Sequence, residues 1–214
     1  MITSFDLFGT LVEVPRPSDP AVAVQTELNA RGIPVPEDWS DAFTEYHLDL
    51  PEGAELSLPE HTMAALASRD IHPRDHVPSG ALETATQAVL TAFDPGSVTT
   101  RDGATAAVDA AAEYDKVAVL SNCTVPGLVS LTLERSTLDE ERFDVVVSSV
   151  ECGWRKPDPR AFAAVTARLD GSFDELVHVG DDPDTDGGAA NIGAKSILVP
   201  ETSLTDLPTV LEEL

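Results

Sequence analysis

Four short polar elements in the sequence carry residues that could do chemistry on an anionic substrate. Asp6 lies near the end of the first apolar run and is followed by Gly9 and Thr10, so its carboxylate stands beside a tight turn, as suits a nucleophile. Three further elements follow later apolar runs or precede a helix. They are the pair Ser121–Asn122, the basic pair Arg155–Lys156 with the prolines after it, and the acidic stretch 181–186.

Each of these residue types has a physical reason to be there. The Ser121 hydroxyl can donate to an oxygen of an anion, and Lys156 presents a positive charge where a negatively charged group can sit. The carboxylates at Asp181 and Asp186 suit a hard cation such as Mg²⁺. One such element alone is a weak signal, whereas all four in this order make a strong one.

Five apolar runs are expected to be the strands that position these elements. They are enriched in Val and Ile, and most end at or next to Gly, Ser or Asp, which favours buried strands over helix fragments. Helical stretches alternate with the later runs, so the sequence predicts an α/β fold with a parallel sheet covered on both faces. Ligands of such sheets bind at the carboxyl ends of the strands. The runs are 2–8, 116–121, 144–149, 176–180 and 195–199, with helices over 103–113 and 158–169.

The chain after the first run breaks this rhythm, because no comparable strand follows for about a hundred residues. It reads instead as helical segments separated by Pro-, Gly- and His-bearing links. An insertion directly after a strand end lies over the active-site edge of the sheet. The sequence therefore predicts a helical cap domain at 14–96 and a core domain formed by 1–13 and 97–214. The expected cap helices are 19–32, 41–48, 58–68 and 80–93.

In this order the four elements resemble the motifs of the haloacid dehalogenase superfamily, a large group dominated by Mg²⁺-dependent phosphohydrolases. The acidic element and the helix after it, 180–194, are similar to the fourth motif of that family. The resemblance implies a Rossmann-like parallel sheet of order 5-4-1-2-3, with strands numbered along the chain, and an inserted all-helical cap. It also implies a small phosphorylated substrate.

The resemblance assigns a role to each element. Asp6 would be the nucleophile and would be phosphorylated transiently, while Ser121 would hydrogen-bond the phosphoryl oxygens and Lys156 would offset negative charge. Both anions need such compensation to approach each other. The ligands of Mg²⁺ would be Asp6, the Phe8 backbone carbonyl, Asp181 and Asp186, the last directly or through water. The substrate contacts would be Gly9, Thr10 and Asn122.

Phe8 departs from the phosphatase pattern, in which a second Asp stands two residues after the nucleophile and acts as general acid. Haloacid dehalogenases carry an aromatic residue there, attack carbon and use no metal. Asp181 favours the phosphatase, because a dehalogenase has no use for another anion beside its nucleophile. A dehalogenase-like hydrolase and a catalytically weak phosphate-binding protein are the alternatives. The cap residues that could supply the missing acid are Glu45, His47 and His61.

The charge of the chain narrows the class of partners. The sequence has 38 acidic and 13 basic residues and a formal charge of −25, which opposes binding to nucleic acids or anionic membranes. The acids are spread along the whole chain and only three basic residues are Lys, a pattern that favours a halophilic protein over an ordinary solubility surplus. No signal peptide or membrane span is evident, so we expect a cytoplasmic protein.

Overall fold

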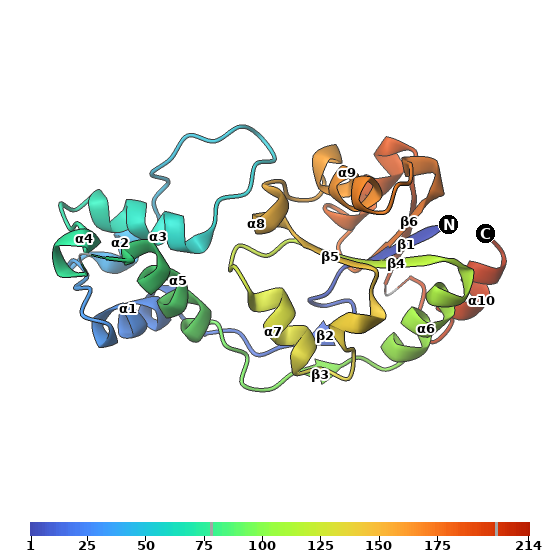
Figure 1. Cartoon of the computed structure of the whole chain (residues 1–214), viewed down its shortest axis with the longest axis horizontal. Coiled ribbons are helices and arrows are strands. Elements are labelled where there is room, and N and C mark those ends of the chain that lie inside the picture. The colour runs from blue at the N-terminus through green and yellow to red at the C-terminus, as the bar shows by residue number, and fades with distance from the viewer. Residues whose placement is uncertain (78, 200) are drawn as a thin grey trace.

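A five-stranded parallel sheet forms the centre of the protein, which we describe from a computed structural model covering residues 1–77, 79–199 and 201–214 (Figure 1). The sheet order is β5-β4-β1-β6-β7. Read from the β7 edge and numbered along the chain, this is 5-4-1-2-3, so the predicted order is confirmed. The strands are β1 (Ile2–Phe5), β4 (Lys116–Ser121), β5 (Val145–Ser148), β6 (Leu176–Gly180) and β7 (Lys195–Leu198).

The register of the central strands brings the polar elements to one edge. Phe5 at the end of β1 lies opposite Val119 of β4 and Val179 of β6. The next residue, Asp6, still donates its backbone N–H to the Val179 carbonyl, at 2.8 Å. Ser121 ends β4 two residues beyond Val119. The carboxyl ends of the three central strands therefore deliver their side chains to a common place.

Alternate side chains of the strands pack on opposite faces, as the pleat of a strand requires. In β4, Val117 and Val119 join one apolar cluster, while Ala118 and Leu120 join another. The first face carries α6 (Ala104–Tyr114), α7 (Leu128–Glu134) and α10 (Leu207–Glu212), and the second carries α9 (Pro159–Arg168) and the 3₁₀ segment η3 (Asp186–Ile192). The remaining core elements are β2 (Val12–Glu13), β3 (Thr99–Thr100), α8 (Ser149–Cys152), η1 (Glu140–Arg142) and η2 (Phe173–Glu175).

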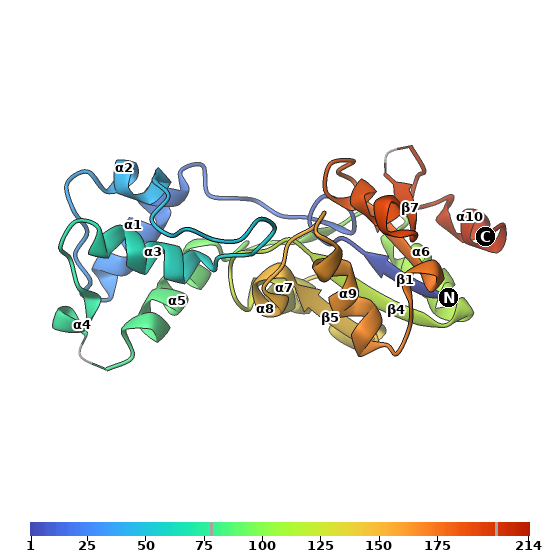
Figure 2. The same ribbon diagram turned by 90° about the horizontal axis from the view of Figure 1, so that it is seen from above.

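A group of helices between β2 and β3 lies beyond the end of the sheet toward which β1 runs, as Figures 1 and 2 show. Within it α5 packs against both α1 and α3, and the buried Trp39 donates its indole N–H to the Ala21 carbonyl at 2.8 Å. Antiparallel pairing of β2 with β3 brings the two connections to this group together. The exact division into domains stays a prediction. The helices are α1 (Pro20–Ala30), α2 (Trp39–Thr44), α3 (Leu58–Ala67), α4 (Pro73–His76) and α5 (Ala81–Ala92).

The helix predicted over 41–48 differs from α2, which begins at Trp39 and ends at Thr44. The helix starts early because Trp39 is buried against α1, and burial of a large aromatic outweighs the turn tendency of the residues before it. It ends early because the rest of the predicted helix, residues 45–48, has no apolar face that is buried. Tyr46 is 99% exposed and Leu48 is 47% exposed.

In the described part of the chain, every helix is too short or too polar to cross a membrane.

The large excess of acidic residues is the main constraint on the stability of the fold. Ion pairs such as Lys116–Asp144 and Arg69–Glu45 lie at the surface, where each stabilises the fold only slightly. The 38 acids outnumber the basic residues almost three to one, so most carboxylates cannot have an ion-pair partner of their own.

We expect the thermal midpoint to rise when potassium chloride is raised from 0.1 to 1 M, because the screening length falls from ~10 Å to ~3 Å and self-repulsion weakens. A gain of ~1 kcal/mol would move the midpoint by ~2–4 °C for a chain of this length. Circular dichroism melting over this range of potassium chloride checks the prediction. A midpoint that is flat in salt would contradict the electrostatic explanation.

Candidate active site

The ammonium of Lys156 lies at the centre of the polar elements and is 1% exposed. Its Nζ donates to Asp6 Oδ1 at 2.8 Å, to Asp186 Oδ1 at 2.6 Å and to the Leu120 carbonyl at 2.7 Å. All three protons of the ammonium are therefore used. The ends of β1 and β4 and the start of η3 meet at one buried charge.

Asn122 holds the backbone of Lys156 in place. Its side-chain Nδ2 donates to the Lys156 carbonyl at 2.9 Å, and its Oδ1 accepts from the Lys156 N–H at 2.8 Å. The following segment is fixed by Asp158, which caps α9 by accepting from the Arg160 N–H. The structure thus places Asn122 as a positioning residue for Lys156, and its contact with substrate stays a prediction.

Asp186 is also buried, at 1% exposed, and both its oxygens accept hydrogen bonds. Oδ1 accepts from Lys156 and lies 3.0 Å from His178 Nε2, while Oδ2 accepts from the Asp182 N–H at 3.0 Å. A side chain at position 180 would place its Cβ 2.1 Å from the Asp186 carboxyl carbon, so Gly180 is needed for this approach. The contacts of Asp186 fit a buried residue that fixes the positions of Lys156 and the Asp182 backbone.

His178 is the residue that the sequence did not mark as part of the site. It packs edge-on against Phe162, as its alternation with apolar residues indicates, but both ring nitrogens are also engaged. Burial and the charge of Lys156 lower the pKa of His178 to about 4, so the ring is neutral at neutral pH. Nε2–H then donates to Asp186, and Nδ1 accepts from the Ser4 hydroxyl at 2.7 Å.

The three buried charges set one another's ionisation. Burial raises the pKa of Asp6 above its usual value, although the charge of Lys156 works against the rise. Burial also tends to lower the pKa of Lys156, but the charges of Asp6 and Asp186 outweigh it and hold that pKa above its usual value. For Asp186, burial is outweighed by the hydrogen bond from His178 and the charge of Lys156, so its pKa lies below the usual range.

Gly9 and Thr10 place Asp181 beside Asp6. The Thr10 hydroxyl donates to Asp181 Oδ1 at 2.9 Å. Gly9 has φ +92°, and a Cβ there would lie 2.6 Å from Asp181 Oδ2. The turn after β1 therefore needs a glycine for its conformation and also for the close approach of Asp181. Direct contact of these two residues with substrate stays a prediction.

The site fits a hard cation. Asp6, Asp181 and Asp186 each offer an oxygen, and the three oxygens lie within 4.8 Å of one another. Over the described residues, Oδ2 of Asp6 and Oδ2 of Asp181 accept no hydrogen bond. Three carboxylates face one buried ammonium, which leaves an excess of negative charge where an anion would have to bind. An all-oxygen set with free acceptors suits Mg²⁺ or a similar ion.

The Ser121 hydroxyl is aimed at the same place and is 1% exposed. No hydrogen-bond partner for its Oγ exists among the residues described. A buried hydroxyl without a partner is costly, by about 1–3 kcal/mol. The loss would be removed by an oxygen atom of a bound anion.

A cavity of about 340 Å³ lies beside these groups, and a second cavity of about 210 Å³ adjoins it. The predicted site residues on the wall of the first cavity are Asp6, Phe8, Ser121, Asn122, Lys156, Asp181 and Asp186. Two arginines line both cavities, Arg155 of the basic pair and Arg16, which no motif in the sequence marks. Glu55 lines the second, and no motif in the sequence could have pointed to it.

The cap residues considered as acids have other partners. Glu45 Oε1 accepts from Arg69 at 2.9 Å. His47 Nε2 lies 2.7 Å from the Ala42 carbonyl, and His61 Nε2 lies 2.6 Å from the Phe43 carbonyl. These three residues pack within the helical group, and the walls of both cavities are formed by other residues.

Residues 4–193 match the model of one family of hydrolases, described as haloacid dehalogenase-like hydrolase. Among solved structures, the chain is similar to a 2-haloacid dehalogenase from Pseudomonas syringae pv. Tomato DC3000, with TM-score 0.66, 17% identity and coverage of 99% of this chain and 98% of the other. It is also similar to an L-2-haloacid dehalogenase from Xanthobacter autotrophicus, with TM-score 0.57, 21% identity and coverage of 100% and 98%.

A predicted phosphoglycolate phosphatase from Haemophilus somnus 129PT is similar to the same extent, with TM-score 0.59, 14% identity and coverage of 98% of this chain and 97% of the other. No curated protein matches the sequence. At these identities the solved structures show the fold alone. Phosphatases and dehalogenases stand side by side among them, so the choice between the two activities depends on the residues of the site.

We expect Gly9→Ala to destabilise the protein more than Gly32→Ala does. Both positions have positive φ, +92° and +79°, so alanine is strained at each by about 1 kcal/mol. Only at Gly9 would the new Cβ also meet Asp181, whereas nothing lies within 4 Å at Gly32. Urea denaturation measures both losses. Equal losses would show that Asp181 moves aside freely and that its placement does not depend on Gly9.

Proposed function

Because the chain belongs to the haloacid dehalogenase-like hydrolase family, we propose that it is a Mg²⁺-dependent phosphatase. Its substrate would be a small phosphorylated metabolite, hydrolysed through an aspartyl-phosphate on Asp6. The observation that carries the proposal is Asp181, which Thr10 and Gly9 hold beside the nucleophile. A second carboxylate there opposes any anionic substrate unless a cation binds between the two.

Asp6 would attack the phosphorus atom, and the bond between phosphorus and the ester oxygen would break. Lys156, held 2.8 Å from Asp6, keeps the nucleophile oriented and offsets charge on the phosphoryl group. The orphan Ser121 hydroxyl would donate to a phosphoryl oxygen. Water would then hydrolyse the acyl phosphate and free Asp6. The residues that would hold Mg²⁺ are Asp6, Asp181 and the Phe8 carbonyl, with Asp186 behind them.

Bound Mg²⁺ would supply the positive charge that lets the two anions approach. Asp186 serves this arrangement through its contacts. Both its oxygens already accept protein hydrogen bonds, so it would steady Lys156 and the Asp182 backbone more than it would bind the ion itself. Asp6 and Asp181, each with a free oxygen, are the better ligands.

A haloacid dehalogenase-like activity is the second candidate, and Phe8 is the observation that favours it. An aromatic side chain at this position lines both cavities and cannot transfer a proton. A catalytically weak phosphate-binding protein is the third. Asp181 weighs against the dehalogenase, because carbon chemistry would gain nothing from the extra charge.

Asp181→Asn should weaken Mg²⁺ binding at least ~10-fold and lower aryl phosphate turnover by roughly 100-fold. Calorimetric titration with Mg²⁺ and a phosphatase assay with and without EDTA measure the two effects. The matched control is Asp184→Asn, an exposed acid in the same loop. Activity that EDTA leaves intact, together with halide release from 2-chloropropionate, would replace the phosphatase by the dehalogenase. Mg²⁺ binding without turnover of either substrate would indicate the binding protein.

Phe8 predicts a dependence on the leaving group. Without a carboxylic acid at this position, the first motif cannot protonate a departing alkoxide. Such protonation by a general acid typically raises the rate ~10²–10⁴-fold. Aryl and acyl phosphates leave as stable anions and lose least. The wild type should therefore hydrolyse phenyl phosphate far faster than a simple alkyl phosphate.

Phe8→Asp should raise turnover of the alkyl phosphate. Phe8→Asn should not, because asparagine has the shape of aspartate but cannot transfer a proton. Glu55 lines the adjoining cavity, and its Oε2 accepts from the Ser149 hydroxyl at 2.6 Å. The variant Glu55→Gln tests whether this carboxyl group already supplies the proton. Equal wild-type rates on alkyl and aryl phosphates that persist in Glu55→Gln would contradict this account of Phe8.

A further inference from the structure

The two cavities beside the nucleophile meet at a junction formed by the residues they share. These shared residues are Phe8, Arg16, Asn122 and Arg155. Beyond the junction, the second cavity has a mostly apolar wall that includes Val14, Phe93, Val125 and Leu128. A molecule with its phosphoryl group at Ser121 and its body in the second cavity would pass the two arginines that line both cavities.

These two arginines differ from most arginines of the chain. Six of the ten pair with carboxylates, as expected where acids outnumber bases so heavily. Across the described residues, the guanidinium groups of Arg16 and Arg155 make no hydrogen bond or ion pair, and outside this site the same holds only for Arg74 in α4. Two unpaired cations at one junction, in a protein of charge −25, point to an anion that comes from outside.

The backbone around Arg16 is stiff. Pro15 precedes Arg16 and Pro17 follows it, and both prolines line the second cavity with it. A proline fixes its own φ, and it also restricts the residue before it to extended conformations. The Arg16 side chain is exposed and free, but it projects from a segment with few alternative shapes.

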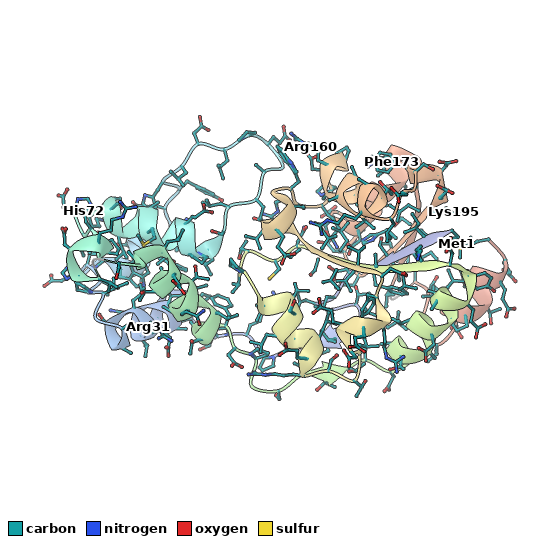
Figure 3. The ribbon with its side chains drawn as sticks, viewed as in Figure 1. Met1, Arg31, His72, Arg160, Phe173 and Lys195 are labelled. Atoms are coloured by element: carbon teal, nitrogen blue, oxygen red, sulfur yellow. The ribbon has the colours of Figure 1, made fainter. Side chains whose placement is uncertain are left out.

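The backbone of Arg155 is fixed by contacts on both sides. Its N–H donates to the Gly53 carbonyl at 3.0 Å, and its carbonyl accepts from the Asp158 N–H at 3.0 Å. Next to it, the Arg160 guanidinium lies 3.2 Å from the centre of the Trp154 ring. Figure 3 shows Arg160 where the loop from the helical group reaches the core. The Arg155 side chain is exposed, so its unpaired guanidinium group projects from a backbone that hydrogen bonds hold in place.

Glu55 and Asp182, two of the described acids near the junction, each accept a hydrogen bond at one oxygen and form no ion pair with either arginine. Glu55 Oε2 accepts from the Ser149 hydroxyl at 2.6 Å, and Asp182 Oδ1 accepts from the Asp184 N–H at 2.9 Å. Lys156, the other cation on the wall, is saturated by Asp6, Asp186 and a carbonyl. The partners of the phosphoryl group would be the free Ser121 hydroxyl and a cation held by Asp6 and Asp181, so the arginines remain for a different negative group.

We propose that Arg16 and Arg155 bind a second anionic group of the substrate, a carboxylate or a further phosphoryl. The inference rests on the proposed phosphatase function and names its substrate class: a small phosphate ester with an apolar body and one more negative charge. Guanidinium suits this task, because its planar array of N–H groups matches a carboxylate or phosphate with two parallel hydrogen bonds.

The test compares two ligands of the same shape, 3-carboxyphenylphosphonate and 3-carbamoylphenylphosphonate, which differ only in the charge of the group remote from phosphorus. A third, 3-phosphonophenylphosphonate, asks whether a phosphoryl serves better than a carboxylate. Calorimetry with Mg²⁺ measures their affinity for wild type, Arg16→Gln, Arg155→Gln and the double variant. Potassium chloride is kept at a concentration at which circular dichroism shows a folded chain. Arg74→Gln is the control for loss of an unpaired arginine elsewhere.

We expect the wild type and Arg74→Gln to bind the carboxylate at least ~10-fold more tightly than the carboxamide, and the double variant to bind both alike. The matching phosphate esters should show the loss mainly in KM, with kcat little changed, because the contact is present in ground state and transition state alike.

Equal affinity of the wild type for carboxylate and carboxamide would overturn the inference, while hydrolysis of both esters would leave the phosphatase standing. Equal weakening of both ligands in the arginine variants would also overturn it, since the arginines would then bind the reacting phosphoryl group. Failure of every phosphonate to bind, with no ester hydrolysed, would defeat the proposed function and the inference together.

Discussion

Lys156 places a buried ammonium 2.8 Å from Asp6 and 2.6 Å from Asp186, with the Leu120 carbonyl accepting its third proton. Such a group is tolerated inside a protein only when its charge and all its donors are matched, and removal of one partner typically costs about 3–5 kcal/mol. The three acceptors come from β1, β4 and η3, so the ion network also fixes the relative position of these elements. His178 completes it by donating to Asp186 from a neutral ring.

The same network leaves an excess of negative charge at the site. Lys156 balances one of the carboxylates, and Asp186 keeps its charge because its pKa lies below the usual range. Asp181 adds a further negative charge, which Thr10 and Gly9 hold in place. In a partly buried site these charges act on one another more strongly than in water. Similarity of fold does not separate phosphatase from dehalogenase, and this excess of charge is the observation on which the proposed phosphatase activity rests.

The sheet and the meeting of the four motifs could be predicted from the sequence, because buried parallel strands are continuous apolar runs and their carboxyl ends share one edge. Contacts between distant segments could not. His178 reads as a packed strand residue until η3 brings Asp186 to it. Asn122 reads as a substrate contact, and its pairing with the Lys156 backbone depends on the loop before α9. Glu55 carries no local signal, since its location depends on how the loop after α2 docks.

That docking joins the helical group to the edge of the sheet that carries the polar residues. Ala54 pairs with Trp154 as an isolated antiparallel bridge, and the Glu55 N–H donates to the Gly153 carbonyl at 2.9 Å. A side chain at position 53 would place its Cβ 2.3 Å from the Asp158 carboxylate, so only glycine permits the contact. The loop at 53–55 thus holds the segment 153–155, and the residue after that segment is Lys156. One short stretch of backbone therefore sets both a wall of the cavities and the position of the buried ammonium, and a shift of the loop would disturb the two together.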